Sequence, residues 1–92
     1  MLFMVIERYK NRDADAVYRR FREHGRMLPE GLQYLDSWVE PNFDRCFQLM
    51  SADDPDLFQE WISHWDDLVD FEIVPVLTSK EASERISNLS RQ

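Results

Sequence analysis

Four polar residues interrupt stretches that otherwise read as apolar strands, and they are the first candidates for chemistry. They are Glu7, Asp36, Gln48 and Glu72. Burial of such groups costs free energy unless each one is paired or has a function. Asp36 alternates with Tyr34 and Trp38, which predicts that all three lie on one face of a strand. Among aromatic rings the pKa of a carboxyl group is raised, which makes Asp36 a candidate catalytic acid or base.

Both carboxyl groups also have a simpler interpretation. Glu7 lies toward the end of its strand, where it can reach solvent, and Asp36 can face water if its strand is at an edge. His64 is the second catalytic candidate, because imidazole titrates near neutral pH. The alternative for His64, and for His24, is a partly exposed position at the C-terminal end of a helix.

A second feature is the high content of aromatic residues, with three tryptophans among 92 residues. We expect Tyr34, Trp38 and Trp65 to form the walls of a ligand pocket, with Gln48 as a polar group inside it. The alternative is ordinary packing, because aromatic side chains dominate small cores.

The single cysteine, Cys46, excludes a disulfide within the chain and fits a reducing cytoplasm. It lies in a predicted central strand, so we expect buried packing rather than a nucleophile. No pair of His or Cys residues has metal-ligand spacing, and His64 with Asp67 is only a weak hint. Two glycines in the whole chain exclude a glycine-rich phosphate loop. We therefore expect neither a metal nor a cofactor.

These candidate residues are positioned by a strand–helix–strand pattern that occurs twice. The first copy spans residues 1–9, 14–24 and 32–40, and the second spans 45–51, 56–66 and 70–77. Asp13 is a plausible N-cap of the first helix and Gly25 its C-terminal stop. Thr78 and Glu81 form a capping box before a short terminal helix. The expected organisation is one domain over residues 1–78 and a helical tail over 79–92.

This element order predicts an α+β, ferredoxin-like βαββαβ fold with a four-stranded antiparallel sheet in the order 4-1-3-2. Two helices then cover one face of the sheet. Residues 2–6 are apolar at both parities, which indicates a central strand, whereas Pro75 places the last strand at an edge. A turn over residues 41–44 sets Glu40 opposite Arg45 and Trp38 opposite Phe47.

Charge and hydropathy narrow the choice of partners. The net charge of −7 argues against binding to nucleic acid or to an anionic membrane. The apolar start of the chain is short, so we expect neither a signal peptide nor a membrane span. The uncovered sheet face spans several hundred Å² and has apolar residues on its central strands, which predicts a homodimer that packs sheet against sheet. The alternative is that the short terminal helix covers this face.

The chain resembles the dimeric α/β-barrel superfamily and, more closely, a small bacterial family of unknown function. The resemblance covers about residues 1–80 and rests on five stretches: residues 1–7, 25–31, 36–40, 44–50 and 58–61. It implies a pocket between the sheet and its helices. Superfamily relatives include cofactor-free monooxygenases, haem-degrading enzymes, muconolactone-isomerase-like enzymes and stress-response proteins, but none of their catalytic motifs maps onto this chain.

The leading hypothesis is a cytoplasmic homodimer that binds a small, partly aromatic or apolar molecule in a pocket between sheet and helices, as a cofactor-independent monooxygenase- or isomerase-like enzyme. Its rival is a non-catalytic protein-interaction or stress-response module. A pocket of roughly 300 Å³ with converging polar groups favours the first. A solid core, with Asp36 and His64 in open water, favours the second.

Overall fold

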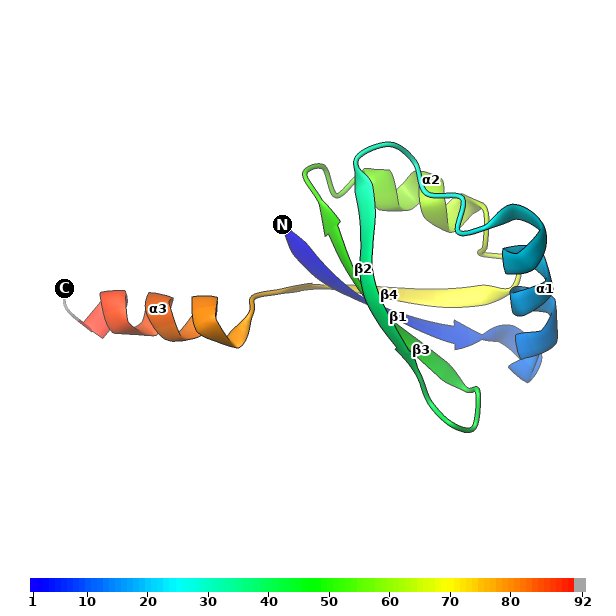
Figure 1. Ribbon diagram of the computed structural model, residues 1–92, viewed down its shortest axis with the longest axis horizontal. Helices are drawn as coiled ribbons and strands as arrows, with labels where there is room; N and C mark the ends of the chain where they lie inside the picture. The colour runs from blue at the N-terminus through cyan, green and yellow to red at the C-terminus, as the bar shows by residue number, and fades with distance from the viewer. Residues whose placement is uncertain (91–92) are drawn as a thin grey trace.

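The computed structural model describes residues 1–90 and confirms the doubled strand–helix–strand order (Figure 1). Its elements are β1 Leu2–Tyr9, α1 Ala14–His24, β2 Leu32–Val39, β3 Arg45–Ala52, α2 Leu57–Ser63, β4 Val69–Val76 and α3 Ser79–Ser90. A single 3-10 turn, Lys10–Arg12, joins β1 to α1. The helix predicted over 56–66 is shorter in the structure, because turns follow Ser63. The last two residues of the predicted tail, 91 and 92, lie outside the described residues.

The sheet has the order β2-β3-β1-β4 and is antiparallel throughout, which is the predicted 4-1-3-2 order read from its other edge. β1 and β3 are therefore central, and Pro75 lies in the edge strand β4. The predicted register of the β2–β3 hairpin is also confirmed, since Trp38 pairs with Phe47. Next to the turn, Arg45 Nε lies 2.7 Å from Glu40 Oε1.

A β-bulge in β2 corrects one prediction. Tyr34 pairs with Met50 and Asp36 with Leu49, so Leu35 is an extra residue between them. The extra residue reverses the alternation, and Tyr34 shares a face with Ser37, whose Oγ lies 2.6 Å from the tyrosine Oη. The prediction that Tyr34 shares a face with Asp36 and Trp38 is therefore wrong.

Local capping interactions start and end the helices at the residues that the sequence predicts. The Asp13 carboxylate accepts a hydrogen bond from the Ala16 backbone N–H at 3.1 Å. Gly25, with φ at 69°, donates its N–H to the carbonyl of Phe21 at 2.7 Å. Thr78 and Glu81 bond reciprocally at 3.1 and 3.2 Å, which is the capping box at the start of α3.

The core lies between the helices and one face of the sheet. Its largest fully buried side chains are Trp61, Met50, Val5 and Val69. Phe3 and Phe58 add an edge-to-face aromatic pair, with ring centroids 5.0 Å apart. Because β1 and β3 alternate between the two faces, their remaining residues, among them Met4, Ile6, Phe47 and Leu49, point to the other side.

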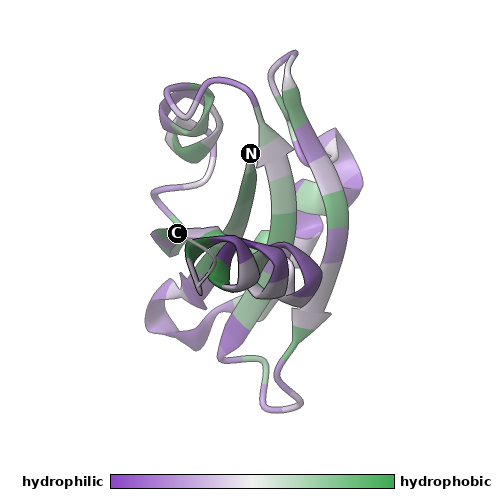
Figure 2. Cartoon of the chain, turned by 90° about the vertical axis from the view of Figure 1, so that its left-hand side faces the viewer, coloured by the Kyte–Doolittle hydropathy of each residue, from purple (hydrophilic) through white to green (hydrophobic). Residues whose placement is uncertain are grey.

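No part of residues 1–90 covers that second face, which we call the open face. α1 and α2 lie on the opposite side of the sheet, and α3 extends away from the sheet (Figure 1). Viewed from the α3 end, this helix stands in front of the sheet and carries both hydrophilic and hydrophobic residues (Figure 2). Ile86 and Leu89 on α3 are 64% and 65% exposed. Among the described residues, no helix is both long enough and apolar enough to cross a membrane.

Candidate functional site

A cavity of about 160 Å³ lies between the helices and the core-facing side of the sheet. Most of its wall is aromatic or aliphatic, and its polar groups come from β1, β2, β3, α1 and the loop after α1. The lining residues are Glu7, Tyr9, Val17, Tyr18, Phe21, Arg26, Ser37, Val39, Cys46, Gln48, Trp61 and Trp65. The sheet, both helices and a loop therefore contribute to one hollow.

Glu7 is the buried acid of this cavity. It follows the apolar run of β1, points to the core side between Val5 and Tyr9, and is only 6% exposed. The side-chain amide of Gln48, on the neighbouring strand β3, donates a hydrogen bond to its carboxylate. Burial raises the pKa of Glu7 from 4.5 to about 7, although Gln48 and the Arg26 charge partly oppose the shift. The carboxyl group thus exchanges its proton near neutral pH.

Arg26 brings the only cation to the cavity lining. Its Nε donates to the side-chain oxygen of Gln48 at 3.3 Å, so Gln48 connects the guanidinium to the buried carboxyl group. The guanidinium lies 3.6 Å from the ring centroid of Tyr34 and 5.0 Å from that of Phe21. Two aromatic faces therefore hold the cation by cation–π attraction, and its planar fork keeps a fixed orientation.

The backbone at Arg26 is held as firmly as its side chain. Its carbonyl accepts hydrogen bonds from two indole N–H groups, at 2.9 Å from Trp61 and 3.0 Å from Trp65. The flanking residues Gly25 and Met27 both have positive φ, at 69° and 59°. A non-glycine residue rarely adopts this conformation, so the tight loop persists because the two indoles hold it.

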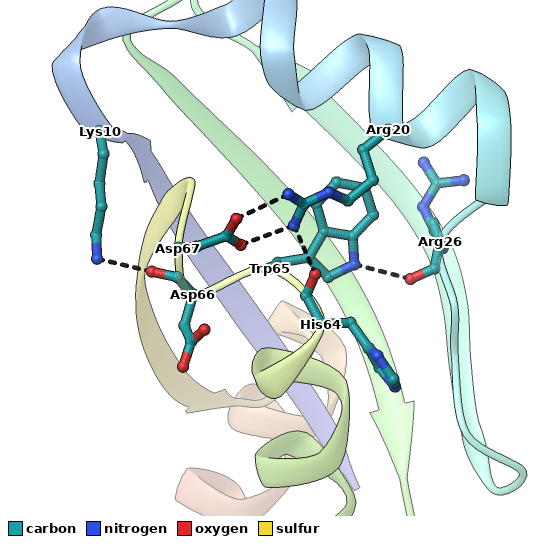
Figure 3. A network of polar contacts seen from close by, with 7 residues as sticks. All are labelled: Lys10, Arg20, Arg26, His64, Trp65, Asp66 and Asp67. Carbon is teal, nitrogen blue, oxygen red and sulfur yellow. Dashed lines mark hydrogen bonds and ion pairs between the residues drawn. The ribbon is translucent and has the colours of Figure 1, made fainter.

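A polar network outside the cavity supports the Trp65 wall (Figure 3). Arg20 from α1 makes two 2.7 Å hydrogen bonds to the carboxylate of Asp67. Its Nη1 also donates to the main-chain carbonyl of His64 at 2.9 Å. The guanidinium lies 5.7 Å from the ring centroid of Trp65. This bidentate pair fastens α1 to the turn after α2 and restricts the indole between them.

Two further polar groups in the lining, Cys46 and Tyr9, stay protonated at neutral pH. Burial raises the pKa of the Cys46 thiol to about 12, and it raises the pKa of Tyr9 as well. A thiol with so high a pKa supplies almost no thiolate at neutral pH, so Cys46 is a poor nucleophile. The expectation of a buried, packed cysteine is confirmed.

The cavity contains only part of the predicted set of site residues. Gln48 and Trp65 line it, and Tyr34 lies at its edge beneath Arg26. Trp38 is on the open face and 52% exposed, and Asp36 is exposed on the same side of its edge strand. His64 is exposed at the end of α2, and its imidazole points away from the Arg20 network (Figure 3).

The residues that matter most here are Glu7 and Arg26. Glu7 is among the polar interruptions of the sequence, but the interpretation of a solvated strand end is wrong, because Glu7 is only 6% exposed. Arg26 carries no periodic signal, since it belongs to a loop. The one available hint was the glycine before it, which allows the sharp turn into the cavity.

Chemically, this arrangement offers a proton-exchanging carboxyl group, an amide and a guanidinium at one side of an apolar hollow. Within residues 1–90, no three His, Cys, Asp or Glu side chains cluster as metal ligands would. Residues 1–90 match a family model described as "Domain of unknown function (DUF3303)". No curated protein and no solved structure matches the chain.

Proposed function

Because the chain belongs to the DUF3303 family, whose function is unknown, we propose a function from the cavity: it binds a small, single-ring molecule that exchanges a proton with Glu7. The observation that carries this proposal is the buried carboxyl group of Glu7, which lines a cavity with aromatic walls. Burial raises the pKa of this group to about 7. Enzymes place general acids and bases in such surroundings.

The volume limits the size of the ligand. A cavity of about 160 Å³ is about half the 300 Å³ expected for a drug-sized ligand. An apolar protein cavity of about 150 Å³ binds benzene, however, so one ring fits. The ligand we propose is therefore one aromatic or apolar ring with a polar substituent, and haem is far too large.

The proposed reaction is a proton transfer in which protonated Glu7 donates its proton to one atom of the ligand and then takes a proton back from another atom. The bonds broken and formed are to hydrogen only, so no oxidant or cofactor is required. This chemistry corresponds to the isomerase-like alternative rather than the monooxygenase-like one. In place of Asp36 and His64, the proposal uses Glu7 as the acid–base group, and Gln48 and Arg26 to orient the ligand.

The proposal includes an assembly and a location. A second copy of the chain covers the open face, which gives a dimeric α/β barrel, and the cavities lie on the outer sides of the two sheets. The apolar residues of β1 and β3 on that face support this dimer. The single, buried cysteine supports a cytoplasmic location. A non-catalytic interaction module is the rival, because an apolar face also suits another protein.

A ligand screen tests the proposed function. Thermal unfolding is followed with single-ring aromatic acids, phenols and quinones, and haem is included as an oversized compound. We expect at least one single-ring compound to raise the midpoint, and Val17→Phe, which fills the cavity from α1, to abolish the shift. Asp36→Ala and His64→Ala are matched controls, because both residues lie outside the cavity, and both should respond like the wild type. If no single-ring compound acts, or if Val17→Phe responds equally, the cavity is not the site and the rival is favoured.

A further inference from the structure

The charge of Arg26 sets the kind of ring that the cavity accepts. Among residues 1–90, the ion pairs join Lys10, Arg20, His24 and Arg45 to carboxylates, and none involves Arg26. Only the Nε of Arg26 is used, by Gln48, in the side-chain hydrogen bonds of the described residues. A guanidinium without a carboxylate partner, fixed between two aromatic faces at a cavity wall, matches the geometry of a carboxylate ligand.

We propose that the ligand is the anion of a single-ring carboxylic acid, paired with Arg26, and that it binds when Glu7 is protonated. This inference rests on the proposed function, since it takes the cavity to be a ligand site. It adds the charge of the ligand and the protonation state that admits it. The ring lies against the aromatic wall, and the carboxylate lies on the polar side with Arg26 and Gln48.

The coupling follows from counting the charges that face Glu7. From β1 and β3 come Tyr9 and Cys46, whose pKa values are raised by burial, so that both groups are uncharged near neutral pH. From α1 comes the hydroxyl group of Tyr18. The loop after α1 contributes Arg26. α2 and the turn after it contribute only the uncharged indoles of Trp61 and Trp65. With Glu7 protonated, the net charge of the lining is +1, from Arg26. With Glu7 ionised, the two charges cancel and the net charge is zero. A carboxylate beside an ionised Glu7 is also repelled in a poorly solvated space.

The size of the effect follows from linkage between proton and ligand. Burial places the pKa of Glu7 at about 7, so its protonated fraction falls about tenfold between pH 6 and pH 8. A ligand that binds only this form loses up to about tenfold in affinity over the same range. Benzoate is a suitable probe because it stays ionised throughout, and benzamide is its uncharged counterpart of nearly equal shape.

The experiment titrates benzoate and benzamide into the protein at pH 6 and pH 8 and follows the fluorescence of Trp61 and Trp65, which line the cavity. For the wild type we expect benzoate to bind more tightly than benzamide at pH 6, and about tenfold more weakly at pH 8 than at pH 6. Glu7→Gln, which is always uncharged, should bind benzoate equally well at both pH values. His64→Ala should keep the wild-type dependence, because His64 does not line the cavity.

Arg26→Met tests the charge without disturbing the loop, because both indoles bind the Arg26 backbone carbonyl rather than the side chain. We expect this variant to lose its preference for benzoate over benzamide, and Arg26→Lys to restore part of it. Benzoate affinity that is independent of pH in the wild type, or benzamide binding as tight as benzoate, overturns the inference. If benzamide or another neutral ring binds and benzoate does not, the proposed function stands without the anion. If no single-ring compound binds, both fail.

Discussion

At the residue scale, Glu7 makes the folded state itself sensitive to pH. The buried carboxyl group binds its proton more tightly when the chain is folded, because burial raises its pKa from 4.5 to about 7. Between these values the folded state holds more protons than the unfolded state. Protonation therefore stabilises the fold, and this contribution is lost as the pH rises through 7. The direction is opposite to that of an ion-paired carboxylate such as Asp67, whose pKa is lowered by Arg20.

Glu7→Gln should remove this dependence. The wild type should gain about 1.4 kcal/mol of unfolding free energy relative to the variant when the pH falls from 8 to 6. Urea unfolding at both pH values, followed by tryptophan fluorescence, measures the difference. The range stays above pH 6 so that Asp67, Glu40 and Glu81, whose pKa values are lowered by their partners, remain ionised. A difference that does not change with pH would show that Glu7 is already ionised or solvated in the fold.

The sequence identifies only part of this site, for physical reasons that differ between residues. Glu7 and Gln48 are visible because a polar residue inside an apolar strand is costly to bury. The position of Arg26 at the cavity could not be predicted, because a loop with positive φ at Gly25 and Met27 places it there. Hydrophobic periodicity gives no information about the path of a loop. Asp36 was misleading because its importance depended on a regular strand, and β2 contains one residue more than regular alternation allows.

At the element scale, short-range signals were sufficient for most boundaries. Asp13 and the Thr78–Glu81 pair act within one helical turn, so their effect can be read from the sequence directly. The hairpin register was also predictable next to the turn, because the cross-strand pair of Glu40 and Arg45 fixes the pairs that follow, as far as Asp36 with Leu49. A bulge is different, since it depends on how the whole edge strand bends over the core.

Truncation after Thr78 tests whether the tail over residues 79–92 is separate from the domain over 1–78. The described part of this tail, α3, has no buried residue and extends away from the sheet (Figure 1). We expect its removal to change the unfolding free energy by less than about 1 kcal/mol, since surface groups without core contacts contribute little. Met50→Ala is the comparison, because Met50 is fully buried and its truncation should cost about 2–5 kcal/mol. A loss from the tail truncation as large as that of Met50→Ala would show that α3 packs against the body or against a second copy.

At the scale of the whole molecule, the described residues 1–90 cover one face of the sheet and leave the other uncovered. A domain of 92 residues buries little surface, so an apolar face left to solvent is a large loss of possible stability. The cavity and the open face lie on opposite sides of the same four strands. Assembly through the open face therefore leaves the cavity free for ligand, and the two proposals can be tested independently.

Leu49→Glu is the sharpest test of the proposed dimer. Leu49 is half-buried on the central strand β3, with Met4 and Asp36 as its cross-strand neighbours on the open face. A carboxylate there would be buried without a partner in a sheet-to-sheet interface, which strongly disfavours association. Light scattering at micromolar concentration should report a dimer for the wild type and a monomer for the variant. Ligand binding in the cavity should be unchanged.

The control for this substitution is Ile86→Glu, which places the same charge on an exposed apolar residue of α3. It should remain dimeric, because the proposed interface is the sheet. A monomeric wild type would contradict the dimer outright, and a dimer lost only in Ile86→Glu would move the interface to α3. In either case the open face would need another occupant, because polar residues such as Asp36 and Glu72 surround its apolar centre but do not cover it. The interaction module, rather than the enzyme, would then be the better description of the molecule.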